Sequence, residues 1–188
     1  MTRMLTCLAL LLPGLACAGS ARVETDVGFT SIRIQAAAVV DADAATVWAT
    51  LTDYNNLARF VPGMTLSRLV SAPNARPKLL EQRGEGGLIA LVVPDHVVFA
   101  LQERPTSRID FRSVGGGLTS VRGEWVILGD RAPVKLGYRA TVMPPLPPPP
   151  LLTDDYVQSE IRLRMNALVR EAERRMAAKQ AATAAPTK

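Results

Sequence analysis

Few side chains in this chain have the chemistry of an acid, a base or a nucleophile. The one imidazole is His96, which follows Pro94-Asp95 at the expected start of a strand, and the two thiols are Cys7 and Cys17, near the N-terminus. A lone histidine beside a turn rarely acts without a partner that orients it, so we interpret His96 as a turn residue rather than a pocket acid or base. With no ligand spacing such as His-x-x-x-His, we predict no catalytic residue, no metal site and no cofactor.

The remaining polar candidates lie on expected strands, where alternation decides which side chains point inward. If Gly123, Trp125 and Ile127 face the core, then Arg122 and Glu124 face solvent, and the apolar side chains favour this register over the reverse.

The same alternation applies to the last strand, where Leu136, Tyr138 and Ala140 share one face. Tyr138 is then an inward residue whose hydroxyl is available to a ligand carbonyl or quinone oxygen. The alternative is a core tyrosine bonded to backbone. Gln82 and Arg83 present the same choice on an earlier strand.

A long helix, over residues 154–176, is the element that must cover these strands. Its apolar residues recur at intervals of three and four, which forms one apolar stripe. They are Val157, Ile161, Met165, Leu168, Val169, Ala172 and Met176. Thr153 is the expected N-cap, and Asp154 and Asp155 suit the positive end of the helix dipole.

The preceding residues predict a sheet with two short helices after its first strand. The helices begin near Asp43, or alternatively Asp41, and near Asp53, and Pro144–Pro150 is an extended connection to the last helix. The expected strands are 31–40, 64–71, 78–84, 92–103, 108–113, 119–128 and 134–143. Short connections between consecutive strands favour antiparallel hairpins, so we predict an α+β fold with the long helix on one face of a curved sheet.

The two ends of the chain lack the strand and helix patterns of this domain. Residues 1–18 combine a basic start, a short apolar run and Ala16-Cys17-Ala18, which predicts a secretory signal peptide cleaved after Ala18 and a periplasmic or secreted protein. A lipoprotein signal cleaved before Cys17 is the second interpretation. We expect an N-terminal arm over 19–30, one domain over 31–176 and a disordered tail over 177–188.

The charge of the chain argues against a nucleic-acid-binding role. The formal charge is +5, and loss of the signal peptide with Arg3 leaves +4, spread along the chain without a basic stripe. Weak attraction to anionic lipid headgroups, and so a transient contact with a membrane surface, remains an open alternative. The apolar run 87–93 is interpreted as a buried strand, with a mobile membrane-touching flap as its alternative.

Several of these motifs resemble the START-like (SRPBCC) superfamily, nearest its branch of polyketide cyclase/dehydrase and coenzyme Q-binding proteins. The resemblance rests on residues 39–54 (Val-Val-Asp-Ala-Asp-Ala-Ala-Thr-Val-Trp-Ala-Thr-Leu-Thr-Asp-Tyr), 60–64 (Phe-Val-Pro-Gly-Met), 123–127 (Gly-Glu-Trp-Val-Ile) and 136–138 (Leu-Gly-Tyr). It covers about 31–176. It implies a helix-grip fold, in which a curved sheet of about seven strands wraps around the C-terminal helix and encloses a hydrophobic cavity.

Taken together, these features favour ligand binding over catalysis. Our leading hypothesis is an exported, non-enzymatic START-like domain that binds a quinone, an isoprenoid or another lipid. The expected cavity residues are Trp48, Phe60, Trp125, Tyr138, Ile161, Met165 and Leu168. The alternatives are a polyketide cyclase or dehydratase, which needs an acid or base inside the cavity, and a cell-envelope interaction module whose cavity is vestigial.

Overall fold

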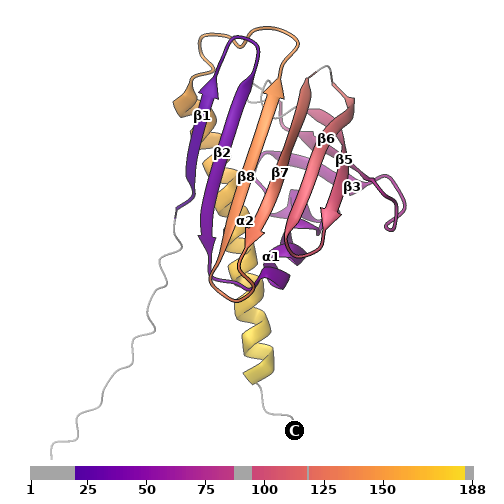
Figure 1. The fold of residues 1–188 in the computed structure, drawn as a ribbon, viewed down its shortest axis with the longest axis vertical. Coiled ribbons are helices and arrows are strands. Elements are labelled where there is room, and N and C mark those ends of the chain that lie inside the picture. The colour runs from indigo at the N-terminus through magenta and orange to yellow at the C-terminus, as the bar shows by residue number, and fades with distance from the viewer. Residues whose placement is uncertain (1–19, 87–94, 118, 185–188) are drawn as a thin grey trace, which may run out of the picture.

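One antiparallel sheet of eight strands dominates the computed structural model, which describes residues 20–86, 95–117 and 119–184 (Figure 1). The strands are β1 (Arg22–Val27), β2 (Ile32–Val40), β3 (Met64–Leu69), β4 (Lys78–Gly84), β5 (His96–Arg104), β6 (Arg108–Gly116), β7 (Ser120–Leu128) and β8 (Val134–Met143). Their order across the sheet is β1-β2-β8-β7-β6-β5-β4-β3. Strands β3 to β8 follow one another as antiparallel neighbours, as the short connections predicted.

Alternation along the strands gives the sheet one apolar face and one polar face. In β2 every second residue is buried, and the four between them are exposed. The buried residues are Ile32, Ile34, Ala36, Ala38 and Val40. The register between β7 and β8 places Trp125 opposite Tyr138.

The long helix α2 (Asp154–Ala184) packs against the inner face of the sheet and lies behind it in Figure 1. Its buried side chains include nearly all of the predicted stripe, from Val157 to Ala172. Thr153 caps it, since its hydroxyl oxygen accepts from the Tyr156 N–H at 3.3 Å. The α+β helix-grip prediction is confirmed, with eight strands in place of about seven.

Of the two short helices, the first agrees with the prediction and the second is shorter than predicted. Helix α1 (Ala44–Leu51) is capped by Asp43, whose carboxylate accepts from the Thr46 N–H at 2.7 Å. The second is a single 3₁₀ turn, η1 (Leu57–Arg59).

Two element boundaries differ from the expectation. Residues 22–27 are not an arm but the edge strand β1, whose Val23 is buried beneath α2 and whose residues pair with β2. Helix α2 continues to Ala184, eight residues past the predicted end at Met176, so residues 177–184 are helical. Lys179 in this extension pairs with Asp43 at 2.8 Å, which ties it to the start of α1.

Two predictions concern residues outside the described part of the chain. They are the signal peptide, with its cleavage after Ala18 or before Cys17, and the apolar run 87–93. Among the helices that the structure does describe, none has a stretch apolar and long enough to span a bilayer.

Candidate functional site

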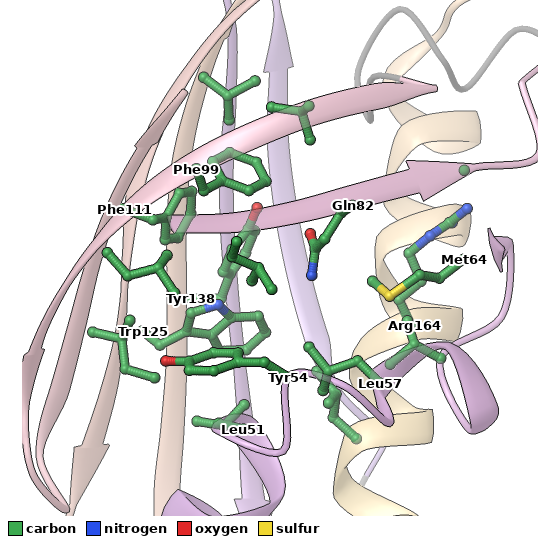
Figure 2. A pocket seen from close by; sticks show the side chains of 18 of the residues that line it. Leu51, Tyr54, Leu57, Met64, Gln82, Phe99, Phe111, Trp125, Tyr138 and Arg164 are labelled. Atoms are coloured by element: carbon green, nitrogen blue, oxygen red, sulfur yellow. The ribbon is translucent and has the colours of Figure 1, made fainter. Parts of the chain in front are cut away.

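A cavity of about 190 Å³ lies between the inner face of the sheet and α2 (Figure 2). Strands β4 to β8 supply one wall, α2 supplies the other, and the chain from α1 through η1 closes one end. Nearly all the lining side chains are apolar. Among the described residues that line the cavity, none is Asp, Glu or His.

The sheet side of the cavity is an aromatic wall made of Phe99, Phe111, Trp125 and Tyr138, one from each of the strands β5 to β8. Phe99 and Phe111 meet edge to face at 5.5 Å between ring centroids, and Phe111 stacks on Tyr138 at 5.9 Å. Trp125 lies 4.5 Å from Tyr138. These contacts arise from alternation on neighbouring strands, which turns all four rings to the same face.

The opposite side is aliphatic and belongs to α2. Ile161, Met165 and Leu168 are spaced by four and three residues, so they lie on one face of the helix. Tyr54 contributes its ring at the closed end, but its hydroxyl is already engaged, since it donates to Glu103 at 2.6 Å. Glu103 also accepts from Lys78 at 2.6 Å.

Tyr138 carries one of the two polar groups of the aromatic wall, the other being the indole N–H of Trp125. Within the described residues, its hydroxyl has no hydrogen-bond partner, and no buried side-chain polar atom is left unsatisfied. The hydroxyl therefore opens onto the cavity. Burial raises the pKa of Tyr138 because the phenolate would be deprived of water. At neutral pH Tyr138 is a protonated hydrogen-bond donor.

Two further polar side chains border the cavity. Gln82 points into it from β4, and its amide donates to the Ser67 hydroxyl at 3.4 Å (Figure 2). Arg164 reaches from α2 toward Met64 and the end of the cavity away from Leu51. Each can present hydrogen-bond donors to a ligand.

The structure brings together most of the predicted cavity residues. Trp125, Tyr138, Ile161, Met165 and Leu168 line the cavity.

Trp48 and Phe60 are not among the lining residues and are corrections to the prediction. Both pack against the core from outside the cavity. The ring of Phe60 faces the Arg175 guanidinium, 5.5 Å from its centroid. Leu51, one turn after Trp48, and Leu57 at the start of η1 occupy the inward positions instead.

The residues considered for acid and base chemistry are dispersed. His96 begins β5, and its Nε2 lies 3.2 Å from Glu81, a carboxylate that Arg68 and Arg83 also contact. Arg122 is exposed on the outer face, opposite Arg112. Over residues 20–86, 95–117 and 119–184, no three His, Cys, Asp or Glu side chains gather as a metal site would require.

Sequence reasoning missed Phe99, Phe111 and Arg164. The two phenylalanines were detectable, because alternation from Ile109 and from Leu101 turns each of them inward. Arg164 does not belong to the predicted apolar stripe, and only its contacts in the folded protein place it at the cavity.

The sequence matches the model of a family described as polyketide cyclase / dehydrase and lipid transport, over residues 31–173. The chain belongs to this family. This match confirms the predicted resemblance to the polyketide cyclase/dehydrase branch. No curated protein matches the chain in sequence.

Solved structures share the fold at low identity. The Zhui aromatase/cyclase from Streptomyces sp. R1128 is 17% identical with a TM-score of 0.59, over 77% of this chain and 95% of that one. A STAR-related lipid transfer protein fragment from Xanthomonas axonopodis is 17% identical with a TM-score of 0.60, over 81% and 93% of the two chains. A START superfamily protein from Mycobacterium smegmatis is 12% identical with a TM-score of 0.53, over 78% and 97%.

Proposed function

We propose that this family member binds a hydrophobic small molecule or lipid, such as a quinone or an isoprenoid, in the cavity beneath α2. The observation that carries the proposal is the cavity lining, which is apolar apart from a few hydrogen-bond donors. Burial of apolar ligand surface, at about 25 cal/mol per Å², drives binding in such a site, and the donors orient the ligand.

The lining also favours binding over acid or base catalysis. A general base must lie within hydrogen-bond reach of the proton that it removes. The lining residues that the structure describes include no carboxylate and no imidazole, and the raised pKa of Tyr138 keeps its proton in place. Tyr138 is suited to donate a hydrogen bond to a ligand oxygen, which is a binding role.

The size of the cavity restricts the ligand. Pockets for drug-sized ligands measure about 300–1,000 Å³, and this cavity is about 190 Å³. A single ring system, such as the head of a quinone, fits it better than a complete isoprenoid chain.

Native mass spectrometry of the protein after gentle extraction tests this function. We expect a bound lipid or quinone, or uptake of one when it is added. Leu168→Phe, which adds volume inside the cavity, should reduce uptake, whereas Leu163→Phe, on the exposed side of the same helix, should not. A protein that is always empty and takes up neither class of ligand contradicts the proposal.

A cyclase or dehydratase is the second candidate, favoured by the family description and by the aromatase/cyclase neighbours. Among the residues weighed for such chemistry, Tyr138 lines the cavity, while His96 and Arg122 do not. Turnover of an aromatic or polyketide-like substrate that survives replacement of all three residues would remove this assignment of the catalytic group.

We further propose that the protein is exported and processed after Ala18, on the strength of its N-terminal sequence. The intact mass of the mature chain should correspond to a start at Gly19. A diacylated Cys17 at the N-terminus would show that the lipoprotein interpretation is correct.

Transient membrane contact also belongs to the proposal. Three large apolar side chains, Phe29, Leu146 and Leu151, are between 73% and 78% exposed at one end of the molecule, and we call them the apolar tip. Exposed apolar groups gathered in this way are typical of interaction surfaces.

A further inference from the structure

Arg164 is the mostly buried cation of the cavity. Arg83 also borders the cavity, but its side chain is 53% exposed and its guanidinium donates to Glu81 on the outer face of the sheet. The side chain of Arg164 is only 15% exposed. Burying a guanidinium beside an apolar cavity costs free energy unless hydrogen-bond partners compensate the charge. The partners of Arg164 therefore show which of its donors are already used.

Contacts on two sides fix the orientation of this guanidinium. Its Nη1 donates to the Glu160 carbonyl at 2.9 Å and to the Glu160 carboxylate at 2.7 Å. Its Nη2 lies against Gly63, where a Cβ would be only 2.5 Å away. Gly63 also has φ +71°, a conformation that glycine adopts without strain. The turn at Gly63 therefore both reverses the chain and makes room for Arg164.

The engaged atoms leave one edge of the guanidinium available. An arginine has five N–H donors in a planar fork. Nη1 is used by Glu160, whereas Nε and Nη2 make no hydrogen bond to any residue that the structure describes. Two adjacent, parallel N–H groups match the two oxygens of a carboxylate.

We propose that the ligand is a hydrophobic carboxylic acid, whose carboxylate binds the Nε and Nη2 edge of Arg164. The inference rests on the proposed hydrophobic-ligand function and names the chemical class of that ligand. The apolar body of the acid lies in the cavity, between the aromatic wall and the aliphatic face of α2.

The neighbouring Glu160 limits how strongly an acid is preferred. Arg164 and Glu160 together are formally neutral, so the attraction comes from two directed donors rather than from net charge. We therefore expect a preference of about tenfold for an acid over its uncharged ester, the size of one charge-assisted hydrogen-bond interaction.

The body of the acid is aromatic or aliphatic, and the cavity favours the aromatic form. Stacked and edge-to-face rings on the sheet side suit a flat ring system. Aromatic and aliphatic acids share the carboxylate that Arg164 would bind. Comparing the affinities of one acid of each kind therefore shows which body the cavity prefers.

The experiment compares the dissociation constants of 2-naphthoic acid, methyl 2-naphthoate and decanoic acid for the full chain, by isothermal titration at neutral pH. We expect the naphthoic acid to bind about tenfold more tightly than its ester. Arg164→Gln should remove that preference by weakening binding of the acid much more than binding of the ester. Arg164→Lys should restore little of it, since lysine lacks the fork. Arg170→Gln, at an exposed position on the same helix, is the matched control and should retain it.

Each result has a defined meaning. Equal binding of the naphthoic acid and its ester, or a preference that survives Arg164→Gln, overturns the acid assignment but leaves the hydrophobic-ligand function standing. A folded Arg164→Gln protein that also loses the ester shows a structural role for Arg164 and overturns the assignment. Binding of neither acid nor ester by the unmodified protein overturns both proposals. Decanoic acid binding more tightly than naphthoic acid supports Arg164 as the anchor and overturns the aromatic body.

Discussion

Tyr138 is held among aromatic rings, with its hydroxyl unbonded to any described residue. Its surroundings disfavour the phenolate, because burial removes the water that would hydrate the negative charge and supplies no cation to replace it. The same surroundings leave the neutral hydroxyl available to a ligand. At this position burial therefore suppresses proton transfer and preserves hydrogen bonding.

Tyr138→Phe should affect ligand binding more than stability. Because no protein bond is lost, we expect the free energy of unfolding to change by less than about 0.5 kcal/mol. Affinity for a carbonyl-bearing ligand should fall about fivefold, the value of one neutral hydrogen bond. Urea denaturation and titration with a quinone measure the two quantities.

Tyr54→Phe is the matched control, because its hydroxyl donates to Glu103 at 2.6 Å. It should destabilise the protein by about 1–3 kcal/mol by leaving part of that carboxylate unsatisfied. If Tyr138→Phe were as destabilising as Tyr54→Phe, the Tyr138 hydroxyl would have a structural partner and its role in binding a ligand would be lost.

Alanine substitutions at Gly63 and Gly86 separate the cost of backbone strain from the effect of displacing the Arg164 guanidinium. Both have positive φ, +71° and +76°, but a Cβ at Gly86 meets no described atom within 4 Å, whereas at Gly63 it meets the Arg164 guanidinium. Each change to alanine should cost about 1 kcal/mol in urea denaturation. Only Gly63→Ala should also reduce the preference for 2-naphthoic acid over its ester. Equal acid preference in the two variants would show that Gly63 does not position Arg164.

The sequence allowed Trp125 and Tyr138 to be placed correctly because alternation along a strand is a local property. Arg164 could not be placed in this way. Its position depends on Gly63, about one hundred residues earlier in the chain, and on which face of the helix the sheet covers. Phe60 was misplaced for a similar reason, since its aromatic character did not reveal the cation–π contact with Arg175.

At the scale of elements, α2 both completes the core and forms a wall of the cavity. Val157, Val169 and Ala172 are buried without lining the cavity, while Ile161, Met165 and Leu168 are buried and line it. A side chain on this helix can therefore contribute to stability, to ligand affinity or to both, depending on its place along the stripe.

Met165→Ala and Met176→Ala should separate these contributions. Met165 is 2% exposed and borders the cavity, so its loss should cost about 2 kcal/mol, near the low end for buried methionine, and should alter ligand affinity. Met176 packs at the edge of the core, so its loss should cost less and leave affinity unchanged. Denaturant midpoints and ligand titrations provide the comparison. A large stability loss for Met165→Ala with unchanged ligand uptake would mean that the stripe is only core.

Ion pairs near the C-terminal part of α2 should make the protein sensitive to acid. A hydrogen bond from Arg174 lowers the pKa of Glu171 to about 2, and one from Lys179 lowers the pKa of Asp43 to about 2. Folded-state pKa values below the unfolded ones stabilise the fold above about pH 4, and this contribution disappears as the pH falls toward 2. Urea midpoints measured from pH 6 to pH 2 should fall over this window.

Glu171→Gln should flatten that decline, because it removes one of the groups that must be protonated. Glu173→Gln is the control on the same helix, since Glu173 forms no ion pair with a described residue. Identical pH profiles for the two variants would show that the Glu171 ion pairs do not govern acid sensitivity.

The positions of the long helix and of seven strands were predictable from periodicity and turn residues, while the ends of the domain were not. Strand β1 is short and mostly polar, and it exists because β2 and α2 offer it partners. The last turns of α2 are exposed and consist mostly of alanine, and the Lys179–Asp43 pair ties them to α1. Both depend on tertiary contacts rather than on local pattern.

At the scale of the whole molecule, antiparallel order brings distant segments to one end. The register places the β1–β2 turn beside the end of β8, and Val27 donates to Asp154 at 3.1 Å, which draws the start of α2 to the same place (Figure 1). Phe29, Leu146 and Leu151 of the apolar tip thus belong to one end, and β4 ends and β5 begins at that same end. Arg83 and Gly84, which border the cavity, lie there as well. Under the proposed membrane contact, this end of the cavity would face the bilayer.

The last prediction is that the apolar tip is responsible for membrane binding. Phe29→Ser combined with Leu151→Ser should lower the partition coefficient for phosphatidylcholine vesicles by more than about a hundredfold in co-flotation, since about 2 kcal/mol of transfer free energy is lost for each apolar side chain that enters the bilayer. Leu128→Ser is the matched control, because Leu128 is 61% exposed but lies at the opposite end of its strand.

Asp154 and Asp155 flank the tip, so adding anionic lipid should not strengthen binding. Binding that depends on anionic lipid, or that Leu128→Ser reduces equally, would show that the contact does not lie at the apolar tip. No flotation of the unmodified protein would exclude a membrane role for the tip.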